Sequence, residues 1–155
     1  MRSSAHAYPE HTDLLQALAE FRFQLRNFIH FSEQAADEAG LHPQQHQLLM
    51  QIAGAPPEAL TTIAYAAERL GLRHHSVVEL ANRSVAEGLL VRLEDAEDRR
   101  RVILSISDKG RSILQSLSAY HRRELRVLGP HLIRALKHIE KLDASHLATS
   151  PRRSA

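Results

Sequence analysis

The chain has 155 residues, of which 43% are hydrophobic and 25% are charged, a composition typical of one folded globular domain or of two small interdependent units. It contains no cysteine, which excludes disulfides, thiolate metal sites, cysteine nucleophiles and thiol-based redox sensing. With 20 Lys and Arg residues against 18 Asp and Glu, the net charge is only +2, so nucleic acid would have to be bound through a local basic patch.

Apolar residues at helical spacing predict a first helix over residues 12–38. Gly40 follows as a C-terminal stop. The row that lies along one helical face consists of Leu14, Leu18, Phe21, Leu25 and Phe28. Further apolar residues lie outside this row, namely Phe23, Ile29 and Phe31. They indicate that the helix packs on more than one side, as at a subunit interface, or that it crosses the core of its own domain.

Three shorter helices are predicted next. Pro43 opens the first of them, which ends at Gly54. The second covers residues 62–70, with Thr61 or Thr62 as its N-cap. After a break at Gly71-Leu72, the third covers residues 74–87. Two helices joined by a short glycine-containing turn are the signature of a helix-turn-helix.

The pattern then changes from helices to strands. Residues 89–93 and 99–106 are predicted to be two strands of a β-hairpin, joined by the acidic turn 94–98. A helix over 108–128 follows, and Gly129-Pro130 is expected to break it. A last helix over 131–147 carries Leu132, Leu136, Ile139 and Leu142 in register. The fold class is therefore mainly α with a small β-hairpin wing (α+β), and residues 149–155 are expected to form a flexible tail.

This order of elements is that of a winged helix-turn-helix flanked by long helices. At this point residues 12–147 resemble the MarR family of bacterial transcription regulators. The segments that carry the resemblance are Leu60–Leu72, Ser76–Arg83, Gly88–Arg92, Asp95–Arg100 and Leu104–Gly110. The most specific part is the acidic turn that leads into Asp98-Arg99-Arg100, followed by the helix start Ser107-Asp108-Lys109-Gly110.

The resemblance implies that different parts of the chain serve dimerisation and DNA binding. Residues 1–40 would form an N-terminal dimerisation helix, residues 41–109 the winged helix-turn-helix DNA-binding domain, and residues 110–148 the C-terminal dimerisation helices. Two half-sites one DNA turn apart, about 34–36 Å, require a two-fold homodimer. We expect a transcription regulator of this kind, a repressor that binds double-stranded DNA and is released from it by a small-molecule effector. The alternative is a dimeric ligand- or protein-binding module without specific DNA binding.

Predicted DNA contacts lie at the start of the second short helix, on the outward face of the third and on the wing. They are Thr61, Thr62, Arg73, His74, His75, Ser76, Glu79, Asn82, Arg83, Arg99, Arg100 and Arg101. Arg pairs with guanine, Asn with adenine, and Glu accepts from cytosine. By family position Arg100 would enter the minor groove, with Arg99 near phosphate and Asp98 as a structural anchor of the wing. Without the resemblance, a solvated helix face would be the preferred interpretation.

The resemblance also implies a small effector, often aromatic or phenolic. Its candidate pocket consists of Phe28, Phe31, Ile52, Tyr65 and Tyr120, each of which is otherwise explained as an ordinary core residue. Two positions depart from the family pattern. Arg73 stands where a capping Ser is common, and Ala96 stands where Pro is common, so affinity and sequence preference stay open.

Enzymatic and metal-binding functions are not expected. His42 and His46 have the spacing of a helical metal pair, but no set of histidines and carboxylates has a convincing spacing, so we predict no metal and no cofactor. His74-His75-Ser76 does not form a triad, because neighbours on a helix point about 100° apart. No apolar run is long enough for a membrane span and the N-terminus resembles no secretory signal, so we expect a cytoplasmic protein.

Overall fold

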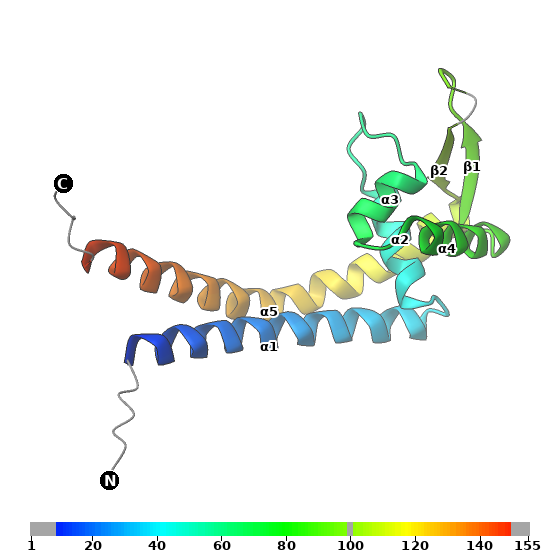
Figure 1. The fold of residues 1–155 in the computed structure, drawn as a ribbon. Coiled ribbons are helices and arrows are strands. Elements are labelled where there is room, and N and C mark those ends of the chain that lie inside the picture. The colour runs from blue at the N-terminus through cyan, green and yellow to red at the C-terminus, as the bar shows by residue number, and fades with distance from the viewer. Residues whose placement is uncertain (1–8, 99–100, 150–155) are drawn as a thin grey trace, which may run out of the picture. The chain divides into compact units, whose positions relative to one another are not determined.

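The structure, a computed structural model, describes the backbone of residues 9–98 and 101–149 and the side chains of 12–98 and 101–142. In chain order its elements are α1 (Pro9–Glu38), α2 (Pro43–Ala53), α3 (Ile63–Leu70), α4 (His74–Ala86), β1 (Leu90–Glu94), β2 (Val102–Ile106) and α5 (Asp108–Thr149) (Figure 1). The chain divides into two compact units. The winged helix unit is Ser32–His121, and the helical arm is the chain up to Phe31 and from Arg122 onward.

The winged helix unit is built on one hydrophobic core, to which α2, α3, α4, the hairpin and the first turns of α5 all contribute. Its most deeply buried apolar side chains are Leu41, Leu48, Leu49, Val77, Leu80, Leu90 and Leu104. β1 and β2 pair antiparallel with Leu90 opposite Ile106. The predicted fold class, mainly helical with a β-hairpin wing, is confirmed.

The turn between α3 and α4 follows from its local sequence. Thr62 is the N-cap of α3, and its hydroxyl accepts a hydrogen bond from the Tyr65 backbone N–H at 3.2 Å. Gly71 ends the helix in the left-handed region, with φ of +64°, which residues with a Cβ rarely adopt. The predicted helix-turn-helix, with Thr62 as one of its two candidate caps, is therefore present.

Helix α2 accounts for the pair of histidines that suggested a metal spacing. Nδ1 of His42 accepts from the Gln44 N–H at 3.2 Å, and the Gln45 side chain accepts from the His42 N–H at 3.3 Å. This capping box uses His42 at the helix start. His46 is instead buried in the core, with 1% of its surface exposed. The two histidines thus have separate structural explanations.

The hairpin is anchored to the loop before α3 and to the start of α5. The Thr61 hydroxyl donates to the Leu104 carbonyl at 2.6 Å, and the Leu104 N–H donates to the Thr61 carbonyl at 2.8 Å. At the other end, the Ser107 hydroxyl donates to the Gly88 carbonyl at 2.6 Å. A Cβ on Gly110 would lie 2.3 Å from the Leu89 carbonyl oxygen, so only glycine fits this close approach.

In the helical arm, α1 and α5 run side by side in opposite directions (Figure 1). Ala17 and Gln24 of α1 and Ala135 of α5 are buried. The apolar row predicted for α1 divides: Phe21 and Phe28 are half-buried, whereas Leu18 and Leu25 are 38% and 39% exposed.

The predicted break at Gly129-Pro130 is wrong, because α5 is one helix of 42 residues that contains Pro130. Proline lacks one N–H and crowds the preceding turn, but its φ is compatible with a helix. The half-buried Leu128 and Leu132 lie on either side of Pro130, and the buried Ala135 continues the same face. Packing of this face therefore offsets the local cost of the proline. The strand predicted over 99–106 is also shorter, since β2 begins at Val102 and residues 99–100 lie outside the described residues.

Candidate nucleic-acid interface

Helix α4 separates into a buried and an exposed face. Val77, Leu80, Ala81 and Ser84 are buried. The Ser84 hydroxyl has a hydrogen-bond partner there, because it donates to the Leu80 carbonyl at 2.9 Å. The exposed side carries five of the predicted DNA contacts, namely His74, His75, Glu79, Asn82 and Arg83, while Ser76 is half-buried. These side chains offer both donors and acceptors to a partner, which is the property that base reading requires.

The start of α4 lacks a side-chain cap, as its sequence predicts. Arg73 is the N-cap residue and makes no capping hydrogen bond with its side chain. The first N–H groups of α4 are therefore left without the usual Ser, Thr, Asp or Asn oxygen. Such groups at a helix N-terminus are suited to an anionic oxygen, and the exposed Arg73 side chain adds positive charge there.

Arg92 is a residue of this surface that the sequence analysis missed. It lies on β1, and its Nη2 donates a hydrogen bond to Oδ1 of Asn82 on α4. Strand alternation was the available signal, because Arg92 pairs with the buried Leu104 and so belongs to the inward face of the hairpin. The bond makes the hairpin and the exposed face of α4 one continuous polar surface.

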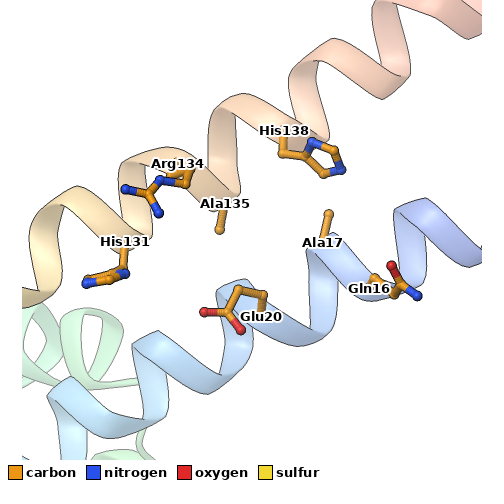
Figure 2. A pocket seen from close by; sticks show the side chains of 7 residues that line it. All are labelled: Gln16, Ala17, Glu20, His131, Arg134, Ala135 and His138. Atoms are coloured by element: carbon orange, nitrogen blue, oxygen red, sulfur yellow. The ribbon is translucent and has the colours of Figure 1, made fainter.

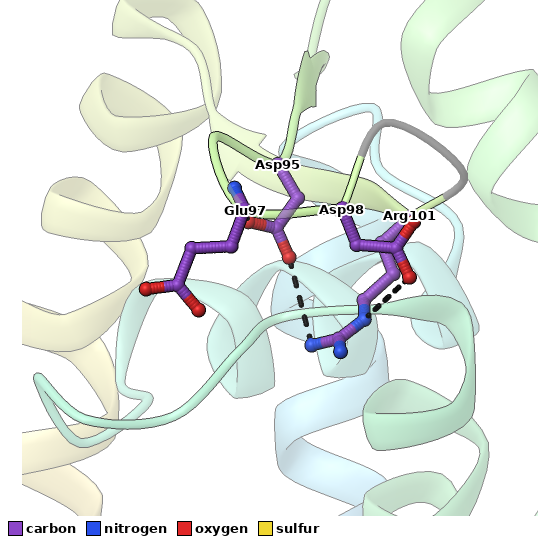
Figure 3. A network of polar contacts seen from close by, with 4 residues as sticks. All are labelled: Asp95, Glu97, Asp98 and Arg101. Carbon is purple, nitrogen blue, oxygen red and sulfur yellow. Dashed lines mark hydrogen bonds and ion pairs between the residues drawn. The ribbon is translucent and has the colours of Figure 1, made fainter.

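The wing holds its third arginine between two carboxylates (Figure 3). Nη1 of Arg101 lies 3.6 Å from Oδ2 of Asp95, and Nε of Arg101 lies 3.5 Å from Oδ2 of Asp98. The Glu97 N–H donates to Oδ1 of Asp95 at 2.9 Å, which shapes the turn. The positive charge of Arg101 is thus partly neutralised by these two carboxylates of the turn. The contact of Asp98 is the kind that a wing anchor makes, and its role stays a prediction.

Two of the predicted wing contacts, Arg99 and Arg100, lie outside the described residues. Thr61 and Thr62 are described, and the hydroxyls of both are engaged within the unit. Thr61 is bonded to β2 and Thr62 caps α3, so both side chains contribute to positioning α3 beside the hairpin. The contacts with DNA that the sequence predicts for Thr61 and Thr62 stay a prediction.

The five candidate effector residues are divided between the units. Phe28 and Phe31 are half-buried in the helical arm. In the winged helix unit, Ile52 is buried, Tyr65 is half-buried and Tyr120 is 61% exposed. Tyr120 lines a cavity of about 250 Å³ together with Ala35, Glu38, Ala39, Ser116 and Leu117. The effector pocket therefore stays a prediction.

His46 and His121 form a stacked pair inside the winged helix unit. Their ring centroids are 5.0 Å apart and the ring planes differ by 8°. Nε2 of His121 lies 2.9 Å from the Ser32 hydroxyl, whereas both ring nitrogens of His46 are buried without a hydrogen-bond partner. Burial, and secondarily the charge of His121, lowers the pKa of His46 from 6.5 to about 4. Burial also lowers the pKa of His121, although a hydrogen bond to the Leu117 backbone opposes that shift.

Within the described residues, no group of three or more His, Cys, Asp and Glu side chains is placed to hold a metal ion. The same part of the chain contains no helix long and apolar enough to cross a membrane.

Comparison with known proteins shows which family this geometry resembles. The model of the MarR family matches residues 39–101. None of the curated proteins compared with the chain matches it. Among solved structures, a MarR family transcription regulator superposes with a TM-score of 0.70 at 18% identity, covering 89% of this chain and 91% of its own.

Two further solved structures concern DNA binding, one as a complex with DNA and one through its regulation by a small molecule. The Staphylococcus aureus MepR–DNA complex gives a TM-score of 0.63 at 18% identity, covering 84% of this chain and 95% of its own. Bordetella bronchiseptica BpsR, whose DNA binding is regulated by 6-hydroxynicotinic acid, gives 0.59 at 14% identity, with 79% and 89% covered. At such identities the superpositions establish a shared fold. The family model and the fold agree: residues 39–101 are similar to the MarR family, and the chain shares the fold of solved regulators of that family.

Proposed function

We propose that the chain is a sequence-specific, double-stranded DNA-binding transcription regulator. The observation that carries the proposal is the exposed polar face of α4 beside the wing, within a MarR family domain. Asn82, Arg83 and Glu79 supply donors and acceptors for base edges in the major groove, and Arg73 lies where a phosphate would meet the helix N-terminus. The wing arginines Arg99 and Arg100 are proposed as minor-groove and phosphate contacts.

The regulator acts as a homodimer on a pseudo-palindromic operator. Support comes from apolar side chains of the helical arm that face solvent in one protomer. On α1 they include Leu15, Leu18, Leu25 and Ile29, which lie with Arg22 in a row whose spacing alternates between three and four, whereas the exposed Phe23 lies outside this row. On α5 they include Leu125, Ile133 and Leu136. A second copy of this chain would cover both rows, as in a four-helix bundle.

Repression and release by a small-molecule effector complete the proposal. Release by a ligand is supported by two solved structures of the same fold: the DNA binding of BpsR is regulated by 6-hydroxynicotinic acid, and CouR was solved with p-coumaroyl-CoA. A ligand acts by favouring a spacing of the two recognition helices that no longer matches the two half-sites. Since such a regulator works where the chromosome is, we place it in the cytoplasm.

Selection of duplexes from a random pool by the full-length chain tests this function. We expect a two-fold related consensus that is bound far more tightly than a scrambled duplex, with an affinity that falls steeply with salt. Arg83→Ala on α4 should weaken binding to the consensus by about 10- to 100-fold. Arg123→Ala, an exposed arginine of α5 in the helical arm, is the control and should leave it unchanged. A chain that enriches no sequence and binds no duplex at low salt is the ligand- or protein-binding module instead.

A further inference from the structure

A groove lined by alanine and by charged or polar side chains lies between α1 and α5 in the helical arm (Figure 2). Its volume is about 400 Å³, within the range of small-molecule pockets, about 300–1,000 Å³. Ala17 and Ala135 face each other at its base and are 5% and 6% exposed. Because both side chains are single methyl groups, the helices leave space above them that larger residues would fill.

The walls of the groove carry complementary charge from the two helices. Arg134, His131 and His138 line it from α5, and Glu20 lines it from α1. Among the described residues, none forms a hydrogen bond or an ion pair with Arg134, although its guanidinium offers five donors. Glu20 is oriented by the Gln24 side chain, whose Nε2 donates to Oε1 of Glu20 at 2.7 Å. That bond leaves the second carboxylate oxygen of Glu20 available.

The spacing along α5 sets the shape of the ligand. His131 and His138 are seven residues apart, which corresponds to about 10 Å along the helix, with Arg134 between them. A single carboxylate on Arg134 cannot reach both histidines at this separation. A ligand with two carboxylates a few ångström apart can place one at Arg134 and the other at His131 or His138, which lie three and four residues from Arg134.

The groove faces away from the apolar rows that we assign to the second copy. Relative to Ala17, Leu18 and Leu25 are rotated by about 80–100° around α1, whereas Glu20 is rotated by about 60° in the opposite direction. On α5, Leu136 and Arg134 likewise flank Ala135 on opposite sides. A dimer joined through the apolar rows therefore leaves the groove open.

We propose that this groove binds a small dicarboxylate that carries a hydroxyl or amino group. Arg134 holds one carboxylate in a bidentate pair, His131 or His138 donates to the other, and Glu20 accepts from the hydroxyl or amino group. The assignment rests on the residues of the helical arm and does not require that the protein bind DNA.

Calorimetric titration of the full-length chain tests the proposal with four probes: L-malate, L-glutamate, succinate and acetate. We expect malate or glutamate to bind more tightly than succinate, which lacks the hydroxyl or amino group, and succinate more tightly than acetate, which has one carboxylate. Arg134→Gln should weaken malate or glutamate binding at least tenfold. Arg126→Gln, an exposed arginine eight residues earlier on α5, should leave the affinity unchanged.

A second variant separates the role of Glu20 from a general effect on the fold. Glu20→Gln keeps an oxygen for Gln24 but loses the charge, so it should remove the preference for malate or glutamate over succinate while succinate still binds. Far-UV circular dichroism checks that each variant retains its helices. The proposal is overturned if the wild-type chain binds no dicarboxylate more tightly than acetate, or if Arg134→Gln binds them as the wild type does. Neither result bears on DNA binding, which is measured separately.

Discussion

At the level of single residues, His46 links the stability of the winged helix unit to pH. Its pKa in the folded chain is about 4, below the ordinary value of 6.5, because protonation would place a charge in the core. The neutral form therefore stabilises the fold fully above pH 6.5, and this contribution is lost as pH falls toward 4. From these two values we expect a loss of about 2 kcal/mol between pH 7.5 and pH 5. Urea unfolding at the two pH values measures it.

The variant His46→Phe keeps a ring against His121 but cannot be protonated. It should remove most of this loss, so that its unfolding free energy changes less between pH 7.5 and pH 5 than that of the wild type. His75→Gln replaces an exposed histidine of α4 and should retain the wild-type loss. If His46→Phe and the wild type respond to pH equally, other groups carry the dependence.

Arg92 determines which part of the Asn82 side chain is presented outward. Because a guanidinium can only donate, it fixes Oδ1 of Asn82 toward the hairpin and leaves the NH₂ group for the proposed contact with DNA. Paired recognition of adenine needs both amide atoms, whereas guanine N7 and O6 or thymine O4 need only a donor. We therefore expect the wild type to favour guanine or thymine where Asn82 contacts the duplex, in place of the adenine that sequence reasoning assigned.

Removing the Arg92 side chain tests this orientation of the Asn82 amide. In Arg92→Ala, Asn82 can rotate, and selection from random duplexes should show adenine rising at one position of each half-site while the other positions keep their preference. Asn82→Ala should instead lose the preference at that position. An Arg92→Ala consensus identical to that of the wild type would contradict the assignment, provided that the wild type yields a consensus.

At the level of elements, local chemistry made most of the fold predictable. Thr62 as a cap, Gly71 as a turn and the alternation of Leu104 and Ile106 each act within a few residues, so the helix-turn-helix and the hairpin could be located from the sequence. The contacts of His46 with His121 and of Asn82 with Arg92 join different elements, and local patterns do not predict them. Alternation along β1 indicates only the face on which Arg92 lies. The continuity of α5 was missed for the same reason, since packing on both sides of Pro130 outweighs a local helix breaker.

Pro130 therefore remains a local weakness of α5. Replacing it with alanine restores an N–H that can donate to the carbonyl of Arg126 and removes the crowding in that turn. We expect Pro130→Ala to raise the free energy of unfolding by about 1–3 kcal/mol. Denaturant unfolding measures the change, and slower amide hydrogen exchange in the turn around residue 130 would locate it.

Pro56→Ala, in the loop after α2, is the matched control. It should not raise stability, because a loop proline reduces the conformational entropy of the unfolded chain. A destabilised Pro130→Ala would mean that the proline itself contributes to packing of the helical arm.

At the level of the whole molecule, the proposed dimer makes DNA binding by the winged helix unit depend on the helical arm. One winged helix unit presents a limited basic surface, because Asp95 and Asp98 share the charge of Arg101 and the net charge of the chain is only +2. Tight binding then depends on engaging two half-sites at once. Joining two modules can raise the overall affinity by about 10²–10⁴ without any new contact. The helical arm is thus as important for operator affinity as the residues that face the bases.

Breaking the apolar row of α1 tests this dependence. Leu25 is 39% exposed in one protomer, so Leu25→Asp costs little within the chain but would bury a charge in the dimer. We expect a monomer by sedimentation, with affinity for a two-half-site duplex reduced by about 10²–10⁴ and that for a single half-site duplex nearly unchanged. Phe23→Asp changes an equally apolar residue that is 56% exposed and lies about 200° around the helix from Leu25, and it should remain a dimer. A Leu25→Asp chain that stays dimeric would place the interface elsewhere, whereas a monomer that keeps full affinity would show that one winged helix unit suffices.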